Sequence, residues 1–205
     1  MKNLTKAALF LSLLIVAACG STSQKVGDYE LSNDASGLVA DDSIAPALLF
    51  VRPNAPDLST FDRFIVDPVS VRYDDPGVEK LSDSDLARMQ NYFRDQVTSE
   101  LRAAGKEVTT EPGENTMRIS FTLSGIKAPS AVPNAAGVLV ATSFSVGEVT
   151  IEAAFSDAEL DEINAIVVDR SRGARFMNAT PWSTWADVES SFDYWARGIG
   201  AAVKP

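Results

Sequence analysis

Residues 82–105 read SDSDLARMQNYFRDQVTSELRAAG, and this stretch decides the fold because it is the clearest helix in the sequence. Its apolar residues recur at spacings of three and four and give one apolar stripe: Leu86, Met89, Phe93, Val97 and Leu101. Ser82 can cap the start, and Gly105 is a good C-terminal stop. A helix with a single stripe needs another layer against it.

Strands surround this helix. Residues 64–71 predict a first strand, in which Pro68 marks an edge or a bulge because proline cannot donate a ladder hydrogen bond. After the helix, residues 117–123 and 149–155 alternate apolar and polar side chains, which indicates half-buried strands. Residues 163–168 are more continuously apolar, as expected of a central strand.

A second amphipathic helix follows Pro181, with Thr184 as its expected cap. Its stripe comprises Trp185, Val188, Phe192, Trp195, Ile199 and Ala202. The element order is β-α-β-β-β-α, and a right-handed crossover places the first helix on one sheet face. The second helix needs the same cover. We therefore predict an α/β (α+β) two-layer sandwich with an about four-stranded sheet and both helices packed on one face.

The N-terminus has the pattern of a lipoprotein signal. Lys2 and Lys6 precede an apolar run at residues 7–18, which is too short for a spanning helix of about 20 residues. The run ends Val16-Ala17-Ala18-Cys19, a lipobox whose cysteine would carry the lipid after cleavage. An ordinary cleaved signal is the weaker interpretation, since Cys19 is the only cysteine of the chain.

The signal resembles those of Gram-negative lipoproteins. That resemblance implies export to the cell outer membrane, because Gly20 and not aspartate follows Cys19. Residues 19–45 are polar and weakly patterned and predict a flexible lipidated tether. We expect residues 46–205 to form a single domain that faces the periplasm and is held at the membrane through Cys19.

Composition excludes several function classes. The chain has 205 residues and net charge −10, and loss of Lys2 and Lys6, two positive charges, leaves −12. Such an acidic protein is a poor match for nucleic acid. It contains no histidine, which removes serine–histidine–aspartate chemistry and imidazole metal ligands. With its lone thiol consumed by lipid, we assign no catalytic residue, no metal and no cofactor.

Several segments resemble the domain of unknown function 3313 family (DUF3313), a set of Gram-negative lipoproteins. They are Phe64–Val69, Val146–Ala153, Val168–Arg170, Trp185–Val188 and Phe192–Ala196. The likeness covers most of residues 45–203. It implies an exported lipoprotein and carries no known reaction, so no catalytic residues are transferred.

Two motifs have better structural explanations. Ser124 and Lys127 have the S-x-x-K spacing of serine acyl-enzymes, but the serine ends a strand and the partner motifs are absent. The acidic loop 157–162 offers oxygen ligands for calcium, but Glu162 stands where an EF-hand loop needs glycine. A solvated hairpin loop is the better interpretation.

Basic and aromatic residues near the second helix are candidate ligand contacts. Arg170, Arg172 and Arg175 could grip phosphate or carboxylate groups, or could pair with neighbouring acids of the chain. Trp182 lies before the helix and could stack on a sugar ring. Both features suit an envelope protein or a cell-wall partner.

Residues 128–145 form a long apolar linker with almost no charge, in which Val138, Leu139 and Val140 are adjacent. Long linkers of this kind are often functional, so it is a candidate contact surface for a partner or lipid. Alternatively, it folds back on the core as a short helix.

Our leading hypothesis is a non-enzymatic binding or envelope-assembly accessory that uses this linker and an open sheet edge. The alternative is a carboxylate-based envelope enzyme that acts on cell-wall or other glycans, with two acids roughly 5–10 Å apart in a cleft. A third reading is a structural spacer.

Overall fold

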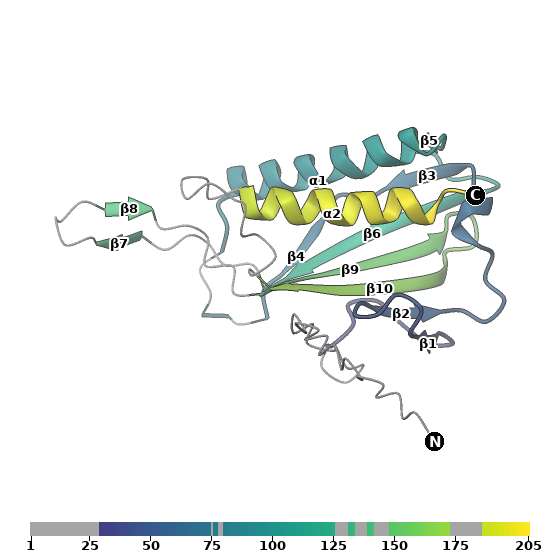
Figure 1. Ribbon diagram of the computed structural model, residues 1–205, viewed down its shortest axis with the longest axis horizontal. Helices are drawn as coiled ribbons and strands as arrows, with labels where there is room; N and C mark the ends of the chain where they lie inside the picture. Colours follow the sequence, from purple (N-terminus) through teal and green to yellow (C-terminus); the bar gives the residue numbers. More distant parts are fainter. Residues whose placement is uncertain are drawn as a thin grey trace, which may run out of the picture.

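The computed structural model describes residues 29–74, 76–77, 80–125, 131–133, 139–141, 148–172 and 186–205. Its body has two layers, an eight-stranded sheet with two helices, α1 (Asp83–Ala103) and α2 (Ala186–Ala202), side by side on one face (Figure 1). This arrangement confirms the mixed α and β class. Within the described residues, neither helix is long and apolar enough to cross a bilayer.

The sheet has the order β1-β2-β10-β9-β6-β3-β5, and β4 also pairs with β6. The strands are β1 (Val39–Asp41), β2 (Leu48–Val51), β3 (Arg63–Val66), β4 (Ser70–Arg72), β5 (Glu107–Val108), β6 (Thr116–Ser124), β9 (Glu148–Asp157) and β10 (Glu162–Arg172). The pairs of β3 with β5 and β6, and of β4 with β6, are parallel, and the other pairs are antiparallel. A separate two-stranded sheet joins β7 (Ala131–Pro133) to β8 (Leu139–Ala141).

The predicted sheet of about four strands is therefore too small. Strands β6 and β9 coincide with predicted strands because their alternation extends over nine and ten residues, and β10 coincides with the predicted continuous apolar strand. In contrast, β1 and β5 have only three and two residues, too few to show a period of two. A short 3-10 helix at Leu58–Thr60 also lacks a sequence period.

Pro68 divides the predicted first strand into β3 and β4, which both run parallel to β6. The amide of Asp67 still donates to the Ile119 carbonyl at 3.0 Å, but proline has no amide to continue the ladder. The carbonyl of Val69, just after the proline, accepts a hydrogen bond from the Gln90 side chain of α1 at 2.6 Å. The break thus ties the sheet to the helix.

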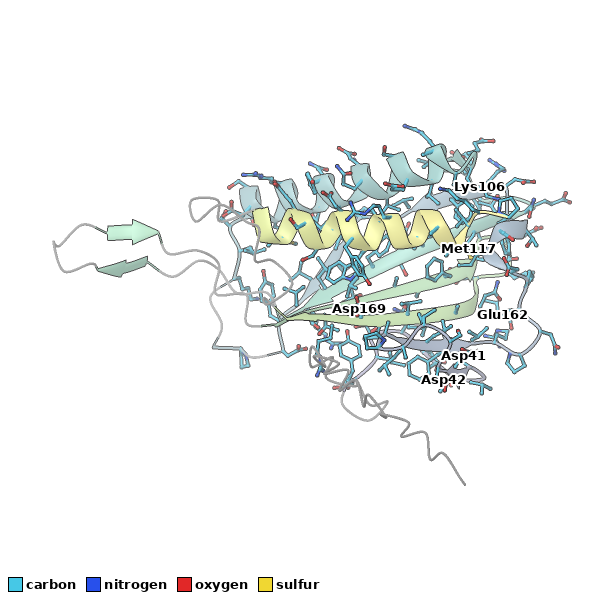
Figure 2. All side chains as sticks on the ribbon, in the orientation of Figure 1. Asp41, Asp42, Lys106, Met117, Glu162 and Asp169 are labelled. Carbon is cyan, nitrogen blue, oxygen red and sulfur yellow. The ribbon has the colours of Figure 1, made fainter. Side chains whose placement is uncertain are left out.

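Helix α1 begins and ends as its sequence predicts. The Ser82 hydroxyl accepts from the Asp85 amide, and Gly105 adopts φ 81° just past the last turn. Between the helices and the sheet, Phe93 packs against Phe121 and Phe192 at ring-centroid distances of 4.8 and 4.7 Å. Figure 2 draws the side chains of the described residues on the same ribbon. This side of the sheet holds the main core.

The opposite face of the sheet is covered by residues 29–38, which we call the strap. Four strap residues pack on buried Phe50, Ala154, Ile166 and Val168: Tyr29, Leu31, Ala35 and Leu38. The strap then continues into β1, the outermost strand. The described part of the predicted tether, residues 29–45, thus lies on the sheet, because its scattered apolar residues complete a second, smaller core.

Candidate functional site

The site centres on Glu152, a carboxylate whose residue is 0% exposed. Glu152 lies in the middle of β9, opposite Thr122 of β6 and Val168 of β10. Because side chains alternate along a strand, it points to the strap side of the sheet, between helix-facing Ile151 and Ala153. A buried carboxylate must find hydrogen-bond donors, since leaving the charge unpaired would cost several kcal/mol.

The strap supplies those donors, and we call the resulting arrangement the clasp. The Ser32 amide donates to Glu152 Oε2 at 2.7 Å. The Asn33 amide and its side-chain Nδ2 donate to Oε1 at 3.0 and 2.6 Å. Both oxygens are thereby satisfied by residues about 120 positions away in sequence. Bonds to a charged acceptor are the stronger class of protein hydrogen bond.

Arg72 at the end of β4 forms a second hold on the strap. Its guanidinium donates to the Glu30 carbonyl at 2.9 Å and to the Ser32 hydroxyl at 2.7 Å. It also lies 5.0 Å from the centre of the Tyr29 ring, within the range of a cation–π contact, and pairs with Asp74 at 2.7 Å. Arg72 therefore joins β4 to three residues of the strap: Tyr29, Glu30 and Ser32.

Titration at this site follows from its burial and charges. Burial raises the pKa of the Tyr29 hydroxyl, and the neighbouring Glu152 charge acts in the same direction. For Arg72, burial opposes the charge, but Asp74, Tyr29 and Glu152 outweigh it and raise the pKa of the guanidinium. The arrangement favours a fixed positive group beside the clasp and keeps the Tyr29 hydroxyl protonated.

A second buried carboxylate, Asp169, lies on the other face of the sheet. Its Oδ2 accepts from the Trp195 indole Nε1 of α2 at 2.9 Å. It follows helix-facing Val167, whereas Glu152 lies across from Val168 on the strap side. The sheet separates these two acids, so they cannot act as a catalytic pair. In the part of the chain that the structure describes, no cluster of three or more metal-ligating residues occurs.

The structure describes only some of the predicted contact residues. Cys19, Val138, Arg175 and Trp182 lie outside the described residues. Leu139 and Val140 belong to β8, so this part of the linker is a strand and not the short helix we considered. Their side chains are not described.

Arg170 and Arg172 are two residues apart on β10, opposite Thr150 and Glu148. The register of Arg170 places it on the strap face, where it is half-buried. The acidic hairpin behaves as a turn, since Asp157 accepts from two amides of its own loop, of Glu159 and Leu160. Neither feature forms a built binding site among the described residues.

Sequence reasoning missed the clasp. Glu152 alternates with apolar neighbours, and this pattern is typical of a side chain that faces solvent. One signal was available, since β10 is apolar on both faces, through Val167 on one and Ile166 and Val168 on the other. A strand of that kind needs cover on both sides.

A family model described as a protein of unknown function, DUF3313, matches residues 21–199. No curated protein matches.

Solved structures resemble the chain only distantly. A PelC dodecamer from Paraburkholderia phytofirmans shares 10% identity at TM-score 0.39, over 78% of this chain and 98% of that one. A DUF4136 family protein from Bacteroides thetaiotaomicron shares 11% at 0.39, over 82% and 98%. A minor lipoprotein from Acinetobacter baumannii shares 9% at 0.28, over 69% and 94%.

Proposed function

The chain belongs to the DUF3313 family of proteins of unknown function, and from this premise we propose that it is a lipoprotein of the outer membrane that acts as a non-enzymatic binding or assembly accessory in the periplasm. Lipidation at Cys19 is the proposed anchor, on the strength of the lipobox. The family has no assigned reaction. The chain contains no histidine, and its single cysteine, Cys19, is the proposed lipid site.

The observation that carries the proposal is the use of the buried acids. Glu152 holds the strap and Asp169 holds Trp195, on opposite faces of the sheet. A glycan hydrolase needs two acids that face one substrate. These two carboxylates stabilise the fold instead, which favours a binding role over the carboxylate-enzyme alternative.

We place the contact surface first at β1. Its three residues are all exposed, and among the described strands it pairs only with β2. Val39 is 58% exposed and Ile44, in the loop that follows, is 41% exposed. An edge strand with free backbone groups can accept an extended segment of another protein by strand addition. The partner we propose is therefore an envelope protein.

Other contacts remain proposals from the sequence. The 128–145 linker, with Val138, Leu139 and Val140, offers a second apolar surface. Arg170, Arg172 and Arg175 would suit anionic groups of a cell-wall partner, and Trp182 a sugar ring.

Site-specific crosslinking in cells tests the proposal. A photoreactive residue would replace Val39 or Ile44 at the edge and Val138 or Leu139 in the linker. Exposed Ser99 on α1 is the matched control. We expect a defined adduct when the photoreactive residue is at position 39 or 44. That adduct should be lost when the other of these two residues is replaced by aspartate. Adducts no stronger than at the control, at all four positions, would refute the binding role.

A further inference from the structure

The clasp has a consequence for how the body stands on the membrane. We infer that it makes the N-terminal segment a short leash, which turns the strap face of the sheet toward the membrane lipid and the two helices away from it. The inference rests on the proposed anchor at Cys19. It replaces the long tether predicted for residues 19–45.

Covalent geometry sets the length of the leash. The first described residue that packs on the sheet is Tyr29, ten residues after Cys19, so the free segment is at most ten residues long. A fully extended chain spans about 3.3–3.6 Å per residue, so the leash reaches at most about 36 Å whatever its conformation. Without the strap, the first fixed residue would be Val39, and the reach would be about 72 Å. The clasp halves the distance.

The strap is held by enough contacts to act as the fixed end. Three hydrogen bonds join it to Glu152, and two more join it to Arg72. Its apolar side chains pack on a second core that includes Phe50 and Ile166. Hydrogen bonds to charged groups are the stronger class of protein hydrogen bond, and together with the apolar packing they fix the strap on the sheet.

A leash no longer than the body restricts which face of the body can lie next to the membrane. A domain of about 150 residues has a radius of gyration near 15 Å and thus a diameter of about 38 Å. The leash is no longer than that diameter, and it starts on the face opposite the helices (Figure 1). A body lying with its helices on the lipid would require the leash to run, fully extended, around its side.

Charge does not pull the strap side flat onto the lipid. Four exposed acids lie on the strap and at β1: Glu30, Asp34, Asp41 and Asp42. The arginines on this side do not outweigh them, because Arg52 and Arg72 are each paired with an acid and Arg170 is half-buried. Figure 2 shows Asp41 and Asp42 on the side of the sheet away from the helices. Binding to anionic lipid instead requires clusters of lysine and arginine. The leash alone therefore sets the distance, and α1 and α2 face the periplasm.

Energy transfer to a membrane dye tests the inference. The full-length lipidated protein is reconstituted into vesicles of phosphatidylethanolamine and phosphatidylglycerol that carry an acceptor on the headgroups. A donor is attached at Ala40→Cys, whose register places it on the strap side, or at Ser99→Cys on α1. We expect much stronger transfer from position 40 than from position 99.

Two variants lengthen the leash. Glu152→Ala breaks the clasp. An insertion of about ten glycine and serine residues after Gln24 doubles the length of the leash and leaves the body unchanged. Both should bring the two transfer efficiencies together, and the insertion decides the matter if Glu152→Ala does not fold.

The outcomes separate the leash from the anchor. Protein that sediments with vesicles but transfers equally from both positions, or is unaffected by the insertion, overturns the leash alone. Cys19→Ala should stay in solution. If the wild-type protein also stays in solution, both the anchor and the leash are overturned.

Discussion

Glu152→Gln isolates the charge of the clasp with little change in shape. Glutamine keeps one acceptor oxygen, which can still serve the two donors of Asn33. Its amide group then meets the Ser32 amide, donor against donor, where a 2.7 Å bond existed. A hydrogen bond to a charged group is worth about 1.5–3 kcal/mol. We therefore expect the free energy of unfolding to fall by about 2–3 kcal/mol.

The loss has an upper limit, because the strap can leave the sheet before the body unfolds. If the substitution costs more free energy than docking of the strap provides, the strap leaves the sheet while the rest of the body stays folded. Release exposes Phe50 and Ile166 in the folded state, so less surface remains to be exposed on unfolding. Since the urea m-value scales with that surface, it should decrease together with the stability.

Urea unfolding of the detergent-solubilised full-length protein measures both quantities. Glu162→Gln is the matched control, because its side chain is 48% exposed and pairs with Arg52 at 3.2 Å on the surface. Exposed pairs contribute about 0–1 kcal/mol. A change for Glu152→Gln no larger than for this control, with an unaltered m-value, would refute the reasoning.

Two further predictions concern the helix layer. An added Cβ at Gly200 would lie 2.9 Å from Glu100 Cβ of α1, so Gly200→Ala should cost about 1–3 kcal/mol, whereas Gly198→Ala, with open space around it, should raise the melting temperature. Burial and a hydrogen bond to Asp193 raise the pKa of Tyr92 to about 12. Because the folded state then holds this proton more tightly than the unfolded state, stability should fall as pH rises from about 10 to 12, and unfolding measurements should show a smaller fall for Tyr92→Phe. Equal slopes in the two proteins would contradict the assignment.

Periodicity explains which parts of the fold the sequence could predict. Helix α1 and the long strands β6 and β9 each extend over enough residues to show a period, and β10 contains a continuous apolar run. Strands β1 and β5 do not. Their positions depend on what lies beside them in space, and a local pattern carries no information about that.

The sequence does not predict the candidate site, for a related reason. Glu152 occupies a polar position of an alternating strand, and its burial depends on Ser32 and Asn33, about 120 residues earlier. No local rule connects these segments. Lipidation at Cys19 rests on a linear motif and stays a prediction, as do the contacts of Val138 and Trp182, which lie outside the described residues.

Amide hydrogen exchange at Ser32 and Asn33 is the most direct test of the clasp, on which the orientation of the body depends. In the wild-type protein both amides donate to a carboxylate that is shielded from solvent. They should therefore exchange far more slowly than the exposed amides of neighbouring strap residues, and Glu152→Gln should abolish most of the protection of the Ser32 amide, which loses its acceptor. Rapid exchange of both amides in the wild-type protein would contradict the account.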